Sequence, residues 1–169
     1  MFVLGHSILG PTLVDKIRRG LPMRWLVVGG LLPDLIDKPL YYSLVALTGK
    51  RGIELGLISG SRTIGHTGLF LLLFVLLAMA RRSLSLTAIA WGIASHLFLD
   101  NLGDAFGRHD GTPTAINALL FPLLGFHFPY SPFHNVGEHL ASLRNWYVLL
   151  GETLGAILLA MAIRRRLRK

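Results

Sequence analysis

The chain alternates long apolar runs with short polar links, and the length of the runs predicts helices rather than strands. Three runs are the strongest helix candidates: Ile64–Ala80, Leu84–Leu99 and Trp146–Ile163. At 1.5 Å per residue, a run as long as Ile64–Ala80 spans roughly 25 Å, close to the hydrocarbon thickness of a bilayer. Two N-terminal runs, Phe2–Ile17 and Met23–Ile36, contain proline or glycine. Such interrupted helices are tolerated inside a bundle whose neighbours satisfy the backbone.

The remaining segments are shorter or more polar. Two further apolar stretches, Leu40–Leu47 and Ala115–Phe128, are predicted to be re-entrant or interfacial. The segments Lys50–Arg62 and Asn101–Thr114 are rich in glycine and charge, and we expect loops there. The pattern therefore predicts an all-α, multi-pass helical membrane protein with about five membrane-embedded helices, forming a single domain over residues 1–169.

Composition supports this prediction. Hydrophobic residues make up 52% of the chain and charged residues 15%, and the mean hydropathy is +0.55. Soluble domains carry about 25% charged residues. The absence of cysteine excludes disulfides and thiolate ligands, so a metal site must use His, Asp and Glu. No basic n-region or cleavage site marks the N-terminus, and we expect no removable signal peptide.

The net charge of +8 is compatible with nucleic acid or with anionic lipid. The placement of the cations favours membrane lipids as partners, because the chain's last basic cluster directly follows an apolar run. This cluster consists of Arg164, Arg165, Arg166, Arg168 and Lys169.

The same cations predict an orientation. If the chain begins outside and crosses the membrane at the five predicted runs, 11 of its 17 Lys and Arg residues lie inside. The positive-inside rule then predicts a protein of the prokaryotic cytoplasmic (inner) membrane with a cytoplasmic C-terminus. In this topology all seven histidines fall at the outer end. Their segregation indicates an outward-facing site.

The centre of that site is predicted from one helical hairpin. His96 and Asp100 are one helical turn apart where a long apolar run ends, and His66 lies where the preceding run begins. A tight link at Arg81–Ser83 joins the two runs, so the hairpin brings the three polar residues together at its far end. Ionisable groups are costly at membrane depth and tend to be functional.

More candidate ligands lie in other segments. His6, Asp34 and Asp37 would join the hairpin residues to hold one divalent ion with an open position for water, or to bridge two ions. Asp34 and Asp37 have alternative roles as helix caps or as partners of Lys38 and Arg62.

Two further candidates stand apart. An outer-loop cluster repeats the His-x-x-x-acid spacing, although an ordinary interfacial loop is the alternative; its residues are His127, His134, Glu138 and His139. Glu152 lies inside the last apolar run, where we expect it to face the bundle interior as a ligand or as a partner of a ligating histidine.

These residues occur in motifs that resemble a known family. In order along the chain the motifs are Gly5–His6, Leu31–Asp37, Arg62–Thr67 and Gly92–Asp100. Over roughly residues 5–125 the chain resembles the small bacterial and archaeal membrane-bound metal-dependent hydrolases, described as LexA-binding, inner-membrane-associated hydrolases. That family often carries Asp-x-Asp-His after the proline, whereas here the second acid is one residue later and Lys38 follows it.

The ligand order also resembles, more distantly, the zinc-dependent phospholipase C and P1 nuclease group. The matching positions are Asp34 or Asp37, His66, His96 with Asp100, His109 or His127, and His134 with Glu138. This resemblance implies a multinuclear zinc site that cleaves phosphate esters.

Together these observations predict a metal-dependent hydrolase, a phospholipase C or lipid phosphatase in type, that cleaves a phosphate ester of a lipid or lipid-linked substrate at the outer face. We expect one to three zinc ions or another divalent metal. The candidate metal ligands are His6, Asp34, Asp37, His66, His96, Asp100, His127, His134 and Glu138. The candidate catalytic residues are Asp34, Asp37, Arg62, Glu138 and Glu152. The alternatives are a metal-ion or proton transporter and a non-catalytic membrane scaffold or regulatory protein.

Overall fold

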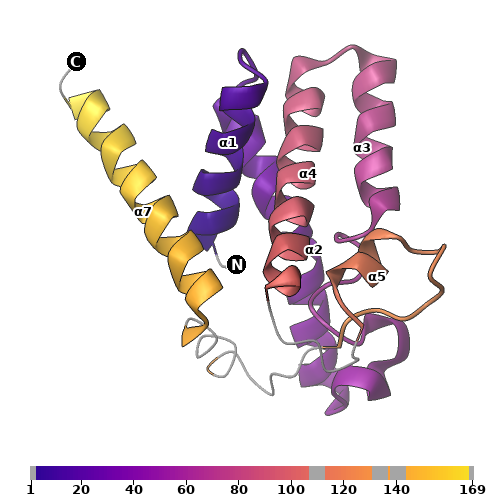
Figure 1. Ribbon diagram of the computed structural model, residues 1–169. Helices are drawn as coiled ribbons and strands as arrows, with labels where there is room; N and C mark the ends of the chain where they lie inside the picture. The colour runs from indigo at the N-terminus through magenta and orange to yellow at the C-terminus, as the bar shows by residue number, and fades with distance from the viewer. Residues whose placement is uncertain (1–2, 107–112, 131–136, 138–143, 168–169) are drawn as a thin grey trace.

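The computed structural model describes residues 3–106, 113–130, 137 and 144–167, and its regular elements over these residues are all helices (Figure 1). The all-α prediction is therefore confirmed. In chain order the elements are η1 (Gly5–Leu9), α1 (Gly10–Ile17), α2 (Met23–Thr48), η2 (Gly52–Ile58), α3 (Gly68–Arg81), α4 (Leu84–Ala105), α5 (Ala115–Leu119) and α7 (Trp146–Leu167).

The first run forms a helix with a widened turn. η1 is a π-helical segment in which the N–H of Gly10 donates to the carbonyl of Gly5, and α1 continues directly from it. Pro11 follows at the first turn of α1 and has no N–H to donate. The predicted interruption is therefore a local change of hydrogen-bond register. Such π-bulges often occur at functional sites.

The second run is longer than predicted. Leu40–Leu47 is not a separate re-entrant or interfacial stretch, because α2 continues without a break through Pro33 and Pro39 to Thr48. A proline removes one hydrogen bond but leaves the rest of the helical ladder on either side. The helix ends at Gly49, which adopts the left-handed conformation that favours glycine.

The helical hairpin forms as predicted, with two shifted boundaries. Thr67 caps α3 by accepting a hydrogen bond from the N–H of Phe70, so His66 lies in the turn before the helix. α4 begins after Ser83, which caps it in the same way, and runs to Ala105. The first five residues of the predicted loop at Asn101–Thr114 are thus helical.

The core lies where α4 packs against α2. Leu26, Ala88 and Ile93 are fully buried there. The two backbones approach closely because both carry glycine at the crossing. A Cβ built on Gly92 would lie 2.8 Å from the Cα of Gly29. Small residues of this kind allow close helix contacts in membrane proteins.

The outer surface of the bundle is apolar. Leucines along α3, such as Leu72 and Leu76, are exposed, as are Leu150, Leu154 and Ile157 on α7. Within the described residues, one helix segment is long and apolar enough to cross a membrane, Trp146–Arg165, with a mean hydropathy of 1.8. Gly68–Arg81 is apolar but shorter. The predicted count of about five membrane-embedded helices is not confirmed by this criterion.

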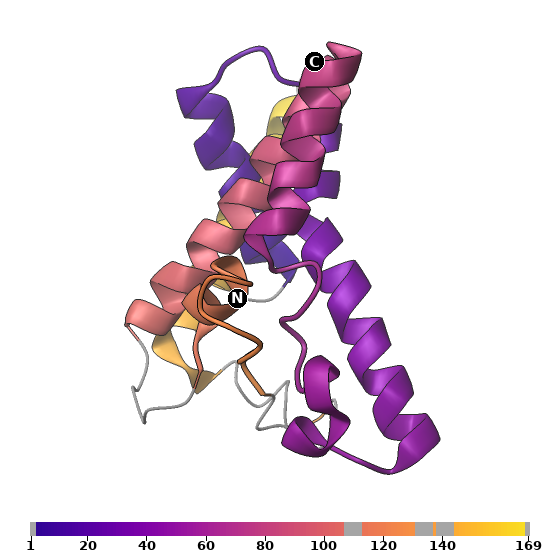
Figure 2. The same ribbon diagram turned by 90° about the vertical axis from the view of Figure 1, so that its right-hand side faces the viewer.

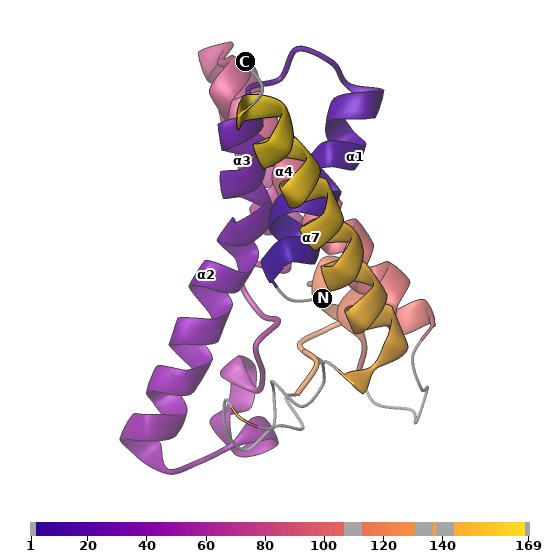
Figure 3. The ribbon, with the colours of Figure 1, turned by 90° about the vertical axis from the view of Figure 1, so that its left-hand side faces the viewer.

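The basic links gather at one end of the molecule. The α1–α2 link, the α3–α4 link and the C-terminal end of α7 lie together at the upper end in all three ribbon views (Figures 1–3). They carry Arg18, Arg19, Arg81, Arg82 and Arg164. The opposite end holds η2 and α5 (Figures 1 and 2).

Candidate metal centre

Six of the predicted ligands meet between the first helix, α2, α4 and the turn before α3. His6 comes from η1 and His66 from the turn, and both are 1% exposed. α4 supplies His96 and Asp100, which are 0% and 3% exposed. α2 contributes a carboxylate pair, the buried Asp37 and the partly buried Asp34. The predicted convergence of His66, His96 and Asp100 is present in the structure.

The two central imidazoles face each other through atoms that carry no proton when the rings are neutral. His96 Nδ1 donates to the carbonyl of Gly30 at 2.7 Å, and His66 Nδ1 donates to Asp37 Oδ2 at 2.7 Å. Because both partners only accept, these tautomers leave the two Nε2 atoms as acceptors. Nevertheless, the Nε2 atoms are 3.1 Å apart. Two facing lone pairs require a cation or a proton between them.

Carboxylate oxygens complete the arrangement. Asp100 Oδ2 is 3.4 Å from His66 Nε2 and 3.7 Å from His96 Nε2. Asp34 Oδ1 is 3.7 Å and 4.0 Å from the same two atoms. Ligands about 2.0–2.2 Å from a tetrahedral ion are separated from one another by about 3.3–3.6 Å. The donor types fit a divalent ion such as zinc. Their spacing would need small movements, because the two Nε2 atoms are slightly too close at 3.1 Å and the carboxylate oxygens reach out to 4.0 Å.

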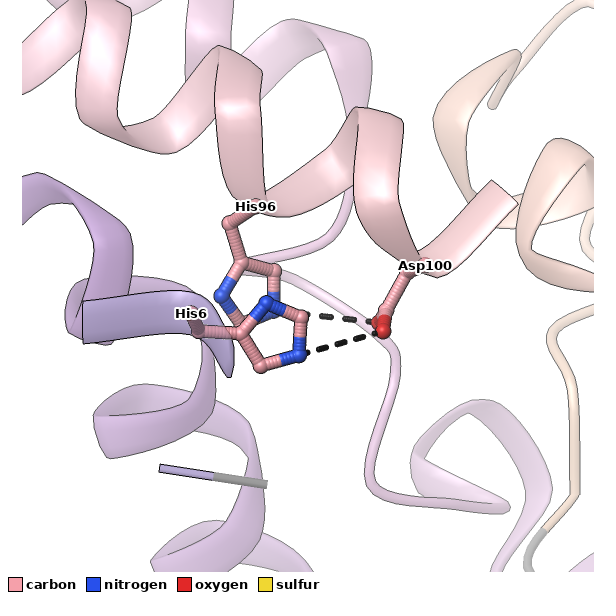
Figure 4. A group of neighbouring side chains, drawn as sticks. All are labelled: His6, His96 and Asp100. Atoms are coloured by element: carbon pink, nitrogen blue, oxygen red, sulfur yellow. Dashed lines mark ion pairs between the residues drawn. The ribbon is translucent and has the colours of Figure 1, made fainter. Parts of the chain in front are cut away.

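His6 adds a third imidazole to this group. Its Nε2 is 3.3 Å from Asp100 Oδ1, the carboxylate oxygen that the other two histidines do not use. Its ring stacks on that of His96, with centroids 3.7 Å apart (Figure 4). His6, His96 and Asp100 therefore form a second group that could hold an ion, and it shares His96 with the group of Asp34, His66 and His96.

Asp37 is placed to orient a ligand rather than to be one. Its Oδ2 accepts hydrogen bonds from Thr63 N at 2.7 Å and from His66 Nδ1, and its Oδ1 accepts from Gly65 N at 2.9 Å. Both oxygens are thus taken by protein donors. A carboxylate that holds the second nitrogen of a ligating histidine fixes its tautomer and raises its basicity.

Two cations flank the centre. Arg62 Nε is 3.0 Å from Asp100 Oδ2, and its Nη1 is 3.0 Å from Asp104 Oδ1. Burial lowers the pKa of Arg62, but Asp100 and Asp104 raise it by more, so the guanidinium stays charged. Lys38 Nζ is 2.6 Å from Asp34 Oδ2. Asp104 was not among the predicted site residues, although its position four residues after Asp100 places it on the same helix face.

The cluster gathers four carboxylates. Among the described contacts, Asp34 pairs with Lys38, Asp100 and Asp104 pair with Arg62, and Asp37 pairs with His66. Burial lowers the pKa of His66, yet its hydrogen bonds to Asp100 and Asp37 raise it overall. Burying several carboxylates together is costly, and a divalent cation bound among them would offset part of that cost.

The other predicted site residues lie elsewhere. Glu152 does not contact the ligands; its carboxylate accepts hydrogen bonds from the backbone N–H groups of Leu4 and Gly5. His127 is exposed beyond α5 and belongs to neither set of ligand atoms. His109, His134, Glu138 and His139 lie outside the described residues.

Over the described residues the chain has only helical elements, an apolar exterior and a buried His/Asp cluster. These features define the class of helical membrane proteins with a candidate metal centre. Residues 2–166 match the sequence profile of the YdjM inner membrane protein family, and the chain belongs to this family. No curated protein and no solved structure matches the chain. The family supports the predicted inner-membrane location. Hydrolase activity, LexA binding and the likeness to phospholipase C stay predictions.

Proposed function

We propose that this protein is a metal-dependent hydrolase of the inner membrane that cleaves a phosphate ester in a lipid or lipid-linked substrate. One observation carries the proposal. The Nε2 atoms of His66 and His96 face each other at 3.1 Å beside the carboxylates of Asp34 and Asp100, while both Nδ1 atoms are engaged by other acceptors. Buried acceptors crowded in this way favour a cation as their common partner.

Different residues of the chain would bind the ion and orient its ligands. His66, His96, Asp34 and Asp100 would hold the ion, zinc by the nature of its donors. Bound there, a divalent ion supplies Lewis acidity that activates water and stabilises charge on a phosphate ester. Asp37 and the Gly30 carbonyl orient the two imidazoles.

Charge at the accessible side supports an anionic substrate. The side chains of Lys38, Arg62 and Asp104 are 26%, 27% and 26% exposed, whereas those of His66, His96 and Asp100 are at most 4% exposed. A substrate therefore approaches past two cations. Among the described residues, the ion pairs of Arg62 use its Nε and Nη1, and its Nη2 is placed to donate to a phosphate oxygen.

The arrangement of the helices supports a lipid-derived substrate at the outer face. The basic links lie together at one end of the bundle, away from η2 and α5 (Figure 1). The positive-inside rule assigns that end to the cytoplasm. The ligands lie at the other end of the α3–α4 hairpin from its arginine link, among helices with apolar outer surfaces. A substrate with acyl chains can reach such a site from the bilayer.

The test is turnover of phospholipids and lipid phosphates by zinc-loaded protein in nanodiscs, with release of phosphate or headgroup as the readout. We expect activity in wild type that falls by at least about a thousandfold in His96→Ala and Asp100→Asn. Glu54→Gln, an acid-to-amide change at an exposed position of η2, is the matched control and keeps activity. Loaded protein that turns over no ester, or Asp100→Asn with full activity, would contradict the proposal. Zn²⁺ flux into liposomes in place of turnover would indicate a transporter.

A further inference from the structure

The C-terminal helix α7 holds the start of the first helix through Glu152. The two carboxylate oxygens of Glu152 accept hydrogen bonds from Leu4 N at 3.0 Å and from Gly5 N at 2.9 Å. The first N–H groups of a helix have no partner within it, and a carboxylate is favoured at this positive end. Gly155 lets the helices meet, because a Cβ there would lie 2.6 Å from the Leu4 carbonyl oxygen.

A second tether joins α7 to the end of α4. The hydroxyl of Tyr147 donates to the carbonyl of Leu99 at 2.7 Å. The ring reaches this carbonyl by passing over Gly103, where a Cβ would lie 2.7 Å from Tyr147 Cε1. The ring of Phe106 packs against the same tyrosine. Figure 3 shows α7 crossing the bundle over the first helix.

Each tether ends next to a residue of the candidate metal centre. Gly5 precedes His6, and Leu99 precedes Asp100. His6 and Asp100 in turn pair with each other at 3.3 Å (Figure 4). We propose that α7 is a clamp whose residues Glu152 and Tyr147 position His6 against Asp100. The inference goes beyond the proposed function by assigning a task to α7, which is long and apolar enough to cross a membrane.

The clamp acts on His6 selectively. His66 and His96 are oriented from α2, through Asp37 and the Gly30 carbonyl, and neither bond involves α7. Loss of the Glu152 carboxylate leaves two N–H groups without their acceptor at the turn that carries His6. This turn then opens more often, while the other two imidazoles keep their partners.

The test is carbethoxylation of the histidines by diethyl pyrocarbonate, quantified for each peptide by mass spectrometry on full-length protein in nanodiscs with EDTA present. The exposed His127 is the internal reference for reagent access. In Glu152→Ala we expect the labelling rate of His6 to rise at least about tenfold, with no change at His66 and His96. Glu152→Gln retains one acceptor oxygen, so its labelling rate at His6 should lie between those of wild type and Glu152→Ala. Leu154→Ala, at an exposed position of α7, is the matched control and labels as wild type.

Two results would overturn the clamp. His6 that labels in Glu152→Ala as slowly as in wild type would show that Glu152 does not hold its turn. A rise at all three buried histidines together would show that Glu152 stabilises the whole bundle instead. Because the assay runs in chelator and measures no turnover, its outcome is independent of whether the protein binds zinc or cleaves an ester.

Discussion

Replacing Asp37 with asparagine separates a residue that orients a ligand from one that binds the ion. The carboxylate is fully buried and accepts three hydrogen bonds, from Thr63 N, Gly65 N and His66 Nδ1. An asparagine has the same shape but only one acceptor oxygen. If that oxygen takes the place of Oδ2, the amide nitrogen faces the N–H of Gly65, and two donors confront each other.

The expected magnitude follows from these contacts. One hydrogen bond is lost, and the two that remain no longer involve a charge, so we expect a loss of about 2–4 kcal/mol in the free energy of unfolding. His66 also loses the carboxylate that fixes its tautomer. Removal of such a partner costs about 10–100-fold in metal affinity. The number of ions bound at saturation should not change, because Asp37 offers no oxygen to the ion.

The assay is competition for Zn²⁺ against a chromophoric chelator, on purified wild type, Asp37→Asn and the exposed acid-to-amide control Glu54→Gln. The control should bind as wild type. Unchanged affinity in Asp37→Asn would refute the orienting role. Loss of a whole equivalent of zinc at saturation would show instead that Asp37 is a ligand.

Three more outcomes are expected. Gly92→Leu pushes α2 away from α4, since even a Cβ would lie 2.8 Å from Gly29 Cα; thermal unfolding in detergent should show a loss of at least about 2 kcal/mol, and unchanged stability would contradict the close crossing. Arg62→Lys removes the fork that joins Asp100 and Asp104, so turnover should fall about tenfold or more with zinc content retained; full turnover would argue against this role. EDTA should lower the unfolding midpoint of wild type, with about 2.7 kcal/mol lost from a site at 100 times its Kd. The midpoint of His96→Ala should not respond to EDTA.

The sequence predicted the centre of the site because the relevant constraints are local. The spacing of His96 and Asp100 places them on one helix face, and two apolar runs of similar length with a short link bring His66 back to them. Because Thr67 caps α3, the helix begins after His66 and not before it as predicted. The imidazole of His66 nevertheless lies in the site, beside that of His96. The predicted convergence was therefore insensitive to the error in the helix boundary.

The roles of the carboxylates depended on tertiary contacts that the sequence pattern does not encode. Asp34 and Asp37 look equivalent in the sequence, but only Asp37 meets three donors from the turn before α3. Glu152 was predicted to face the bundle interior, and it does so as a cap for the backbone of Leu4 and Gly5. Glu152 pairs with these backbone groups because the start of the first helix packs against α7.

The prediction of α2 was too short for a related reason. The sequence analysis ended one run at Ile36 and began a separate stretch at Leu40, yet a single helix passes through both Pro33 and Pro39. The cost of a missing hydrogen bond is offset when the neighbouring turns are packed, as where Gly29 and Gly30 meet α4 and the first helix. Such compensation is a property of the assembled bundle.

The most direct test of the central claim is the metal content of purified protein, combined with X-ray absorption at the metal edge. We predict at least one divalent ion per chain, with imidazole nitrogen and carboxylate oxygen ligands at about 2.0–2.2 Å. His96→Ala and Asp100→Asn should lose that ion, whereas Glu54→Gln should keep it. Wild-type protein without metal, or full metal content in both site variants, would contradict the account.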